Sequence, residues 1–193
     1  DDLHRVSDHI PADQRPVVFV GPYEHHSNEV PWRETIADVV VIAEDTDGHI
    51  DQDLLRRRLE EHADRPLLIG SFSAASNVTG ILSDTAGIAE MGALEGRPLS
   101  YKDAVFFSPH KFIGGPSTPG VLVARRELFA NRVPDVPGGG TVAYVNDDDH
   151  RYLADPTHRE EGGTPAIIES IRAGLVVGLK QAVGTDTIRE QEE

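Results

Sequence analysis

The stretch that decides the fold is "PVVFV", from Pro16 to Val20. It is a short, continuous run of apolar, mostly β-branched residues, which is typical of a strand buried on both faces. The same pattern returns in "DVVVIAE" (38–44) and "PLLIGSFS" (66–73). Two later segments, "DAVFFS" (103–108) and "PGVLVARR" (119–126), predict further strands. The sequence therefore predicts a sheet that is largely buried.

Helical patterns alternate with these strands. Three segments carry the apolar spacing or the end signals of helices: 51–63, 83–91 and 164–183. The first places Leu54, Leu55 and Leu59 on one face and has acidic residues at its start. Ser83 is the expected N-cap of the second helix, and the third has a proline in its first turn. Such alternation predicts an α/β fold: a three-layer α/β/α sandwich around a mixed, mostly parallel sheet, as a single domain over 1–193.

Composition narrows the class of protein. The 193 residues suffice for one domain with a core, and 38% hydrophobic with 26% charged residues is typical of a soluble globular protein. The net charge of −15 argues against nucleic acid and anionic membranes as partners. No apolar run approaches the roughly 20 residues that span a bilayer.

Cysteine is absent, which excludes disulfides, thiolate metal sites and a cysteine nucleophile in this chain. The acidic, polar N-terminal segment lacks the basic start and apolar core of an export signal, so a cytoplasmic location is expected.

Three predicted strands end in polar loops. "PVVFV" runs into "GPYEHHSNEVPW", "PLLIGSF" into "SAASNVTG", and "DAVFF" into "SPHKFIGG". In open α/β sheets, ligands bind beyond the carboxyl ends of the strands. Three loops with usable groups favour a site there more strongly than any one of them alone. The candidate groups are those of His25, His26, Asn77, Thr79, Ser108, His110 and Lys111.

Lys111 lies where a buried strand passes into a loop rich in glycine, proline and hydroxyl residues. A lysine amine attacks carbonyl groups when its neutral form is accessible. The local sequence fits a Schiff-base lysine, a phosphate-binding lysine, or an ordinary exposed loop lysine.

The two histidines are adjacent, and on an extended segment their side chains would point in opposite directions. At most one of His25 and His26 would then face a given ligand, as an acid/base or stacking imidazole; otherwise both are satisfied by nearby backbone. "NDDDH" (146–150) is read as a solvated loop, and without a second cluster of metal-ligand residues no metal site is predicted.

Asn77 begins "NVT", formally a glycosylation sequon, but the expected absence of export leaves a turn asparagine or an amide that orients a ligand. Thr164 stands just before the long predicted helix. Its hydroxyl and the helix N–H groups suit a phosphate, and an ordinary N-cap has the same appearance.

Taken in order, "EHHSN…PW", "SNVTG", "SPHKF.GGP.TPGVLV", "GGGTV" and "EGGTPAI" resemble the class V branch of the fold-type I pyridoxal-phosphate enzymes. The resemblance is greatest to the cysteine desulfurase and selenocysteine lyase group. It extends from about Val17 to Val183, with the motifs in the family's order. It implies the large domain of that fold, pyridoxal 5'-phosphate as cofactor, and an amino acid as substrate.

By this resemblance Lys111 matches the lysine that forms the internal aldimine and then moves the proton at the substrate α-carbon. His25 matches the imidazole that stacks on the cofactor ring.

The remaining matches concern the edge of the ring and the phosphate. Asn77 corresponds to the side chain near the ring 3-oxygen. Ser108 and His110 correspond to phosphate contacts just before the lysine. Thr164 corresponds to a threonine that reaches the phosphate of a neighbouring subunit, which implies a homodimer with shared active sites.

Parts of the family pattern are missing. The acid that pairs with the pyridine nitrogen, in a "D-x-A/G" strand, should lie between Asn77 and Lys111, but only 34 positions separate these two. Neither Asp84 nor Asp103 fits it, so about one βα unit is expected to be missing near Met91–Gly92. An N-terminal phosphate cup and a C-terminal small domain are also not found. Two further hypotheses follow: a catalytically incompetent fragment with the fold alone, and an anion-binding domain that uses no pyridoxal phosphate.

Overall fold

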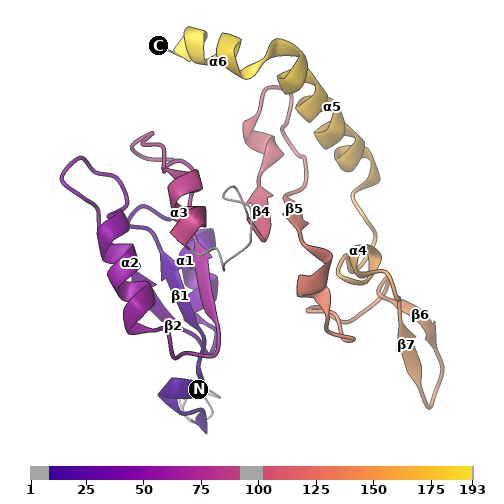
Figure 1. Cartoon of the computed structure of the whole chain (residues 1–193). Coiled ribbons are helices and arrows are strands. Elements are labelled where there is room, and N and C mark those ends of the chain that lie inside the picture. The colour runs from indigo at the N-terminus through magenta and orange to yellow at the C-terminus, as the bar shows by residue number, and fades with distance from the viewer. Residues whose placement is uncertain (1–8, 92–101, 193) are drawn as a thin grey trace. The chain divides into compact units, whose positions relative to one another are not determined.

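The computed structural model describes residues 9–91 and 102–192. The chain divides into two compact units, Asp1–Tyr101 and Lys102–Glu193 (Figure 1). The prediction that the whole chain forms a single domain stays a prediction.

The first unit is built on a parallel sheet of three strands. These are β1 (Val17–Val20), β2 (Asp38–Val41) and β3 (Leu68–Ser71), in the order β2-β1-β3. All four residues of the central strand are buried, as its continuous apolar run predicts. Because β1 and β3 are parallel neighbours, the loops that follow them leave the sheet at the same edge.

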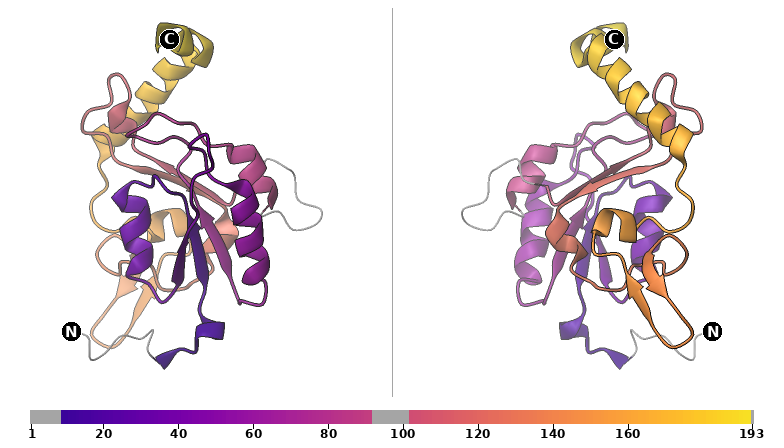
Figure 2. Two further views of the ribbon diagram at one scale, coloured as in Figure 1. Left: turned by 90° about the vertical axis from the view of Figure 1, so that its left-hand side faces the viewer. Right: turned by 90° about the vertical axis from the view of Figure 1, so that its right-hand side faces the viewer.

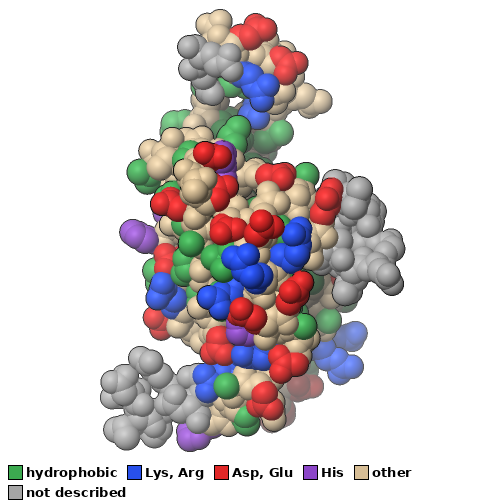
Figure 3. All heavy atoms as spheres, turned by 60° about the vertical axis from the view of Figure 1, so that its left-hand side comes forward, with side chains coloured by type: hydrophobic (Ala, Val, Ile, Leu, Met, Phe, Trp, Pro, Cys, Tyr) green, Lys and Arg blue, Asp and Glu red, His purple; other side chains and the backbone are tan. Residues whose placement is uncertain are grey.

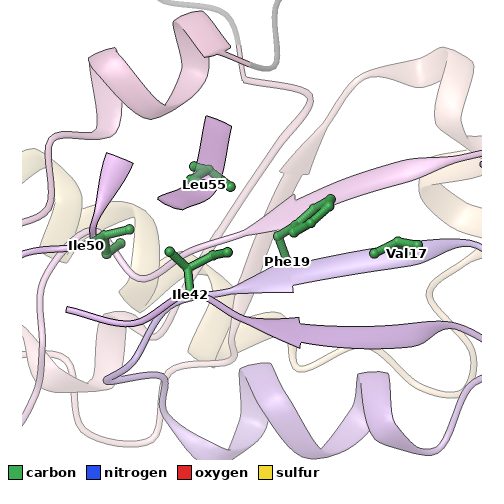
Figure 4. Packing of buried hydrophobic residues seen from close by; sticks show 5 residues of the cluster. All are labelled: Val17, Phe19, Ile42, Ile50 and Leu55. Carbon is green, nitrogen blue, oxygen red and sulfur yellow. The ribbon is translucent and has the colours of Figure 1, made fainter. Parts of the chain in front are cut away.

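Helices cover both faces of this sheet. α1 (His26–Arg33) lies on one side, and α2 (Gln52–Glu61) and α3 (Thr85–Met91) lie on the other (Figure 2). On the α2 side, five buried side chains form the core (Figure 4): Val17, Phe19, Ile42, Ile50 and Leu55. Burying one side chain of this size contributes roughly 1.5–3 kcal/mol. The layered α/β class with a parallel sheet is thus confirmed.

The helix starts differ in detail from the sequence-based expectation. Asp51 caps α2 and accepts the Leu54 N–H at 2.8 Å. α3 begins at Thr85, and Asp84 accepts the Gly87 N–H at 3.0 Å. The prediction of Ser83 as N-cap is wrong, because its hydroxyl donates to the distant Ser73 carbonyl instead.

The second unit contains two antiparallel strand pairs and a long helix. β4 (Ala104–Phe107) pairs with β5 (Val121–Ala124), and β6 (Val142–Val145) pairs with β7 (His150–Tyr152). Between β4 and β5 lies the short 3-10 turn η4 (Pro109–Lys111). The helices α4 (Pro156–Arg159), α5 (Ile167–Val183) and α6 (Thr185–Glu192) follow. The long predicted helix thus begins at Ile167 and not at Thr164.

The surface carries charges of both signs. In the view of Figure 3, acidic and basic side chains are interspersed. On α2, Arg56 pairs with Asp53 at 3.3 Å, and Arg58 with Glu61 at 2.6 Å. Within the described ranges, no helix has the length and apolar character needed to cross a membrane.

Candidate functional site

The loops that carry His25 and Asn77 are joined at the edge of the parallel sheet. Glu24 accepts hydrogen bonds from the Ser73 N–H at 2.9 Å and from the Ser73 hydroxyl at 2.6 Å. The same carboxylate accepts one from Asn28 Nδ2 at 2.6 Å. Because Ser73 follows β3 and Glu24 follows β1, this carboxylate holds the two loops together.

Asn28 extends this network into the sheet. Its side chain is buried; Nδ2 donates to the Ser71 carbonyl at 3.1 Å, and Oδ1 accepts from the Ser71 hydroxyl at 2.6 Å. Trp32 Nε1 donates to the same Oδ1 at 3.4 Å. Sequence reasoning missed Glu24 and Asn28. Their spacing of four residues within "EHHSN" is the signal that could have found them, since residues four apart share a helix face.

His25 is the N-cap of α1, and its Nδ1 accepts the Ser27 N–H at 3.2 Å. The Ser27 hydroxyl lies 2.7 Å from the same nitrogen. The expectation of two histidines on an extended segment is therefore wrong, because His26 is already the first residue of the helix. Since Nδ1 accepts a backbone N–H, the neutral His25 ring carries its proton on Nε2. Nε2 and the two faces of the ring take no part in the capping hydrogen bond.

Asn77 lies in a tight turn after β3. The buried Ser76 closes this turn, because its hydroxyl oxygen accepts the N–H groups of Val78 at 3.2 Å and Thr79 at 3.1 Å. Gly80, at φ +74°, completes it. Asn77 itself is exposed, and within the described part of the chain its amide makes no hydrogen bond. The turn is thus closed by Ser76, and the Asn77 amide stays available.

In the second unit, β4 leads directly into the segment that carries Ser108, His110 and Lys111. The Ser108 carbonyl accepts the Lys111 N–H at 3.2 Å, while the Ser108 hydroxyl makes no capping bond. His110 and Lys111 are exposed. Among the residues that the structure describes, neither side chain has an ion pair or hydrogen bond. Three polar groups at one strand end are therefore unused by the fold.

The loop after Lys111 turns back closely over η4. A Cβ atom at the buried Gly115 would lie 2.0 Å from the Pro109 carbonyl oxygen, so only glycine fits there. The buried Thr118 donates its hydroxyl to the Gly115 carbonyl at 2.7 Å. Ser117, at φ 67°, is the one non-glycine with positive φ among the described residues. This loop therefore has a single, tightly defined path.

Thr164 lies elsewhere in the second unit, next to two packed glycine turns. The Gly163 N–H donates to the Gly139 carbonyl at 2.7 Å, and both Gly140 and Gly163 have positive φ. Thr164 is not an N-cap, since Ala166 holds that position in α5. Its hydroxyl makes no hydrogen bond within residues 9–91 and 102–192.

A hollow in the first unit does not coincide with these groups. It measures about 590 Å³, lies between the starts of α2 and α3, and none of the predicted site residues lines it. Its polar wall includes Asp45, Asp51 and Asp84. The described part of the chain holds no group of three or more His, Asp or Glu that could bind a metal ion.

Comparison with known proteins gives a consistent result. The sequence model of the family described as Aminotransferase class-V matches residues 4–96 and 101–193. A probable cysteine desulfurase of Pyrococcus abyssi is 30% identical over 194 residues, which is 91% of this chain and 47% of the relative. The chain also resembles the solved cysteine desulfurase CsdA of Escherichia coli, at 28% identity and a TM-score of 0.68, over 86% of this chain and 45% of that one. The apo cysteine desulfurase of Thermococcus onnurineus shares the fold, at 24% identity and a TM-score of 0.72, over 93% of this chain and 48% of that one.

The chain spans about half the length of the curated relatives it matches. A probable cysteine desulfurase of Streptomyces coelicolor, 28% identical, aligns over 213 positions with all 193 residues of this chain and 48% of its own length. About 20 positions of that relative therefore have no counterpart here, and the expected absence of an internal βα unit stays a prediction. The place predicted for that loss adjoins residues 92–101, which lie outside the described residues. The family's sequence model matches nearly all residues of this chain, and the chain therefore belongs to the class-V aminotransferase family.

Proposed function

We propose that this chain is the cofactor-holding core of a pyridoxal-phosphate enzyme that acts on an amino acid, as a cysteine desulfurase or a class V aminotransferase does. Its membership of the class-V aminotransferase family supports the proposal, as do relatives that are named cysteine desulfurases. The substrate and the reaction of the whole protein are part of this proposal.

One contrast between side chains carries the proposal. The polar groups beside the predicted site, those of Glu24, Asn28, Ser76 and Thr118, are all used in internal hydrogen bonds. The candidates matched to the family differ. Five of these six make no side-chain hydrogen bond in the described residues, and the sixth, His25, uses only Nδ1. Of the two other candidates, Thr79 accepts the Ile81 N–H at 3.3 Å and so belongs with the groups that the fold uses. Groups that the fold leaves unused at strand ends are the ones available to a ligand.

The chemistry of these groups fits pyridoxal phosphate. Lys111 supplies the amine to which the cofactor aldehyde is attached, and the freed amine can carry a proton to and from the substrate α-carbon. The imidazole of His25 offers an aromatic face for the pyridine ring. Once bound, the cofactor supplies the electron sink that the protein itself lacks.

The other candidates suit the polar edge of the cofactor. The Asn77 amide can donate to the ring 3-oxygen. Ser108, His110 and Thr164 offer donors to a phosphate dianion. Thr164 belongs to a different loop of the second unit from Lys111, and we propose that it serves the site of a second subunit in a homodimer.

Labelling with the cofactor tests the proposal directly. The chain has only three lysines, Lys102, Lys111 and Lys180, so an adduct can be assigned by mass spectrometry. After incubation with pyridoxal phosphate and reduction with borohydride, we expect the adduct on Lys111 in clear excess over the other two.

Two variants and one competitor sharpen this test. Lys111→Ala should abolish the main adduct, and Lys102→Ala, the matched control, should keep it. Equal labelling of all three lysines would contradict the proposal. An anion-binding domain without cofactor chemistry would instead bind inorganic phosphate and give no excess of label on Lys111.

A further inference from the structure

The long helix α5 contacts the loop that follows Lys111 at three points. Arg172 Nη1 donates to the Pro116 carbonyl at 2.9 Å. The buried Val176 packs against Gly114, where an added Cβ would lie 3.7 Å from Val176 Cγ2. Lys180 Nζ lies 5.7 Å from the centroid of the Phe112 ring, within the range of a cation–π contact. Figure 1 shows α5 running alongside this loop.

These three residues form one ridge of the helix. Arg172, Val176 and Lys180 follow one another at intervals of four, and residues four apart lie above one another on a helix surface. We call them the α5 ridge. Each of its members meets a different residue of the loop, in reverse order along the chain, so the ridge follows the loop from Phe112 to Pro116.

The loop also contacts the residues that precede it in the chain. Phe112 stacks on Phe107 of β4, with ring centroids 6.1 Å apart. Gly115 is pressed against the Pro109 carbonyl. The loop is therefore held both by β4 and η4 and by the α5 ridge.

Lys111 has no such support of its own. Its amine ends a flexible stem, and in the described residues no ion pair or hydrogen bond orients it. What the structure fixes is therefore the backbone around Lys111, which sets the point from which this side chain starts. A displacement of a reacting group by about 1 Å can slow a reaction a hundredfold.

We propose that the α5 ridge positions Lys111 for cofactor attachment, with Arg172 as its main positioning residue. This inference rests on the proposed role of Lys111. Arg172 does not touch the reacting atoms; it acts through the Pro116 carbonyl, five positions after the lysine. Because a single directional hydrogen bond makes this contact, it can be removed without emptying the core.

The experiment compares four forms of the full 193-residue chain: wild type, Arg172→Ala, Arg172→Lys and Arg189→Ala. Arg189 lies in α6 and is exposed, and its replacement removes the same charge without touching the loop. We measure the rate of borohydride-trapped pyridoxal-phosphate labelling at Lys111, relative to Lys102 in the same sample. Arg172→Ala should lower this ratio about fivefold, the effect of losing one hydrogen bond. Arg172→Lys, which can still donate to Pro116, should restore most of it, and Arg189→Ala should match the wild type.

A second readout needs no cofactor. Hydrogen exchange of the segment from Phe112 to Thr118 should become faster in Arg172→Ala, while exchange in β1 stays as in the wild type. If exchange of the segment from Phe112 to Thr118 is unchanged in Arg172→Ala, the inference is overturned, whatever the labelling shows. If the wild type labels Lys111 selectively and Arg172→Ala labels it equally fast, the positioning role is wrong and the proposed function stands. If exchange rises as expected but the wild type gives no selective label, the proposed function fails, and with it the link between the ridge and cofactor attachment.

Discussion

At the scale of single residues, Glu24 has the clearest structural task. Its carboxylate accepts four hydrogen bonds, from Gly21, Asn28 and twice from Ser73, and so links β1, β3 and α1. In Glu24→Ala the donors lose their acceptor, and the free energy of unfolding should fall by roughly 2–3 kcal/mol. Urea denaturation measures this loss. Glu60→Ala, an exposed position on α2, is the control and should change stability little. A Glu24→Ala chain as stable as this control would contradict the assigned role.

Asp84 gives a prediction about pH. The Gly87 N–H, and after it the Gln52 side chain, hydrogen-bond to its carboxylate and lower its pKa below the ordinary 3.8. The folded state thus favours the charged form. Its contribution to stability is present above the ordinary pKa and is lost as the pH falls through the folded value.

Nuclear magnetic resonance titration of the Asp84 carboxyl carbon should show a midpoint below 3.8. Gln52→Ala removes one donor and should raise this midpoint. The Asp155 carboxyl, whose pKa is lowered by its hydrogen bond from Arg126 in the second unit, serves as the internal control and should keep its midpoint. An Asp84 midpoint that does not respond to the loss of Gln52 would show that the two side chains do not interact in solution.

At the scale of elements, the loop after η4 depends on Gly115. An alanine Cβ there would lie 2.0 Å from the Pro109 carbonyl oxygen, and the atoms that it would meet all belong to the backbone. Gly115→Ala must therefore displace the loop, and we expect a loss of roughly 2 kcal/mol or more in stability. Gly120→Ala is the matched control, because its Cβ would meet the Phe107 carbonyl at an ordinary 3.9 Å. Urea denaturation of both variants gives their free energies of unfolding. Equal values for the two would contradict the close approach of Gly115 to the Pro109 carbonyl.

The strands with continuous apolar runs were predictable, because burial on both faces leaves a simple pattern in the sequence. Helix α1 was not: it has eight residues, contains Pro31, and is held by Glu24 and Asn28 rather than by apolar periodicity. The pair β6–β7 was also missed. Its turn is built by Asn146, whose side chain accepts the N–H groups of Asp148 and Asp149, and three acids in a row gave no sign of a hairpin.

The candidate site divides in the same way. The positions of Lys111 and Asn77 after strands were predictable, because the sequence predicts those strands, and their roles in a site stay predictions. The contact of Arg172 was not predictable. Its partner is a backbone carbonyl 56 positions away, and no local sequence pattern indicates such a contact. Sequence thus identifies the groups that the fold leaves unused more readily than those that hold them in place.

At the scale of the whole molecule, the proposed dimer implies that Lys111 and Thr164 of one site come from different chains. Thr164→Ala should then weaken labelling of Lys111 by pyridoxal phosphate, since one phosphate donor is lost. Mixing this variant with Lys111→Ala chains should restore the labelling of Lys111. In a mixed dimer, one of the two sites combines an intact Lys111 with an intact Thr164.

With equal amounts of both variants and random exchange of subunits, about half of the Thr164→Ala chains should regain wild-type labelling of Lys111. The control mixture uses chains that carry both substitutions in place of Lys111→Ala, and it should give no recovery. Light scattering of the same samples reports whether dimers are present. Dimers without recovery would place Thr164 and Lys111 of one site in the same chain, and monomers that label Lys111 at full rate would contradict shared sites altogether. Recovery confined to the first mixture would require a Thr164 supplied by the partner, because no chain in that mixture carries both residues intact.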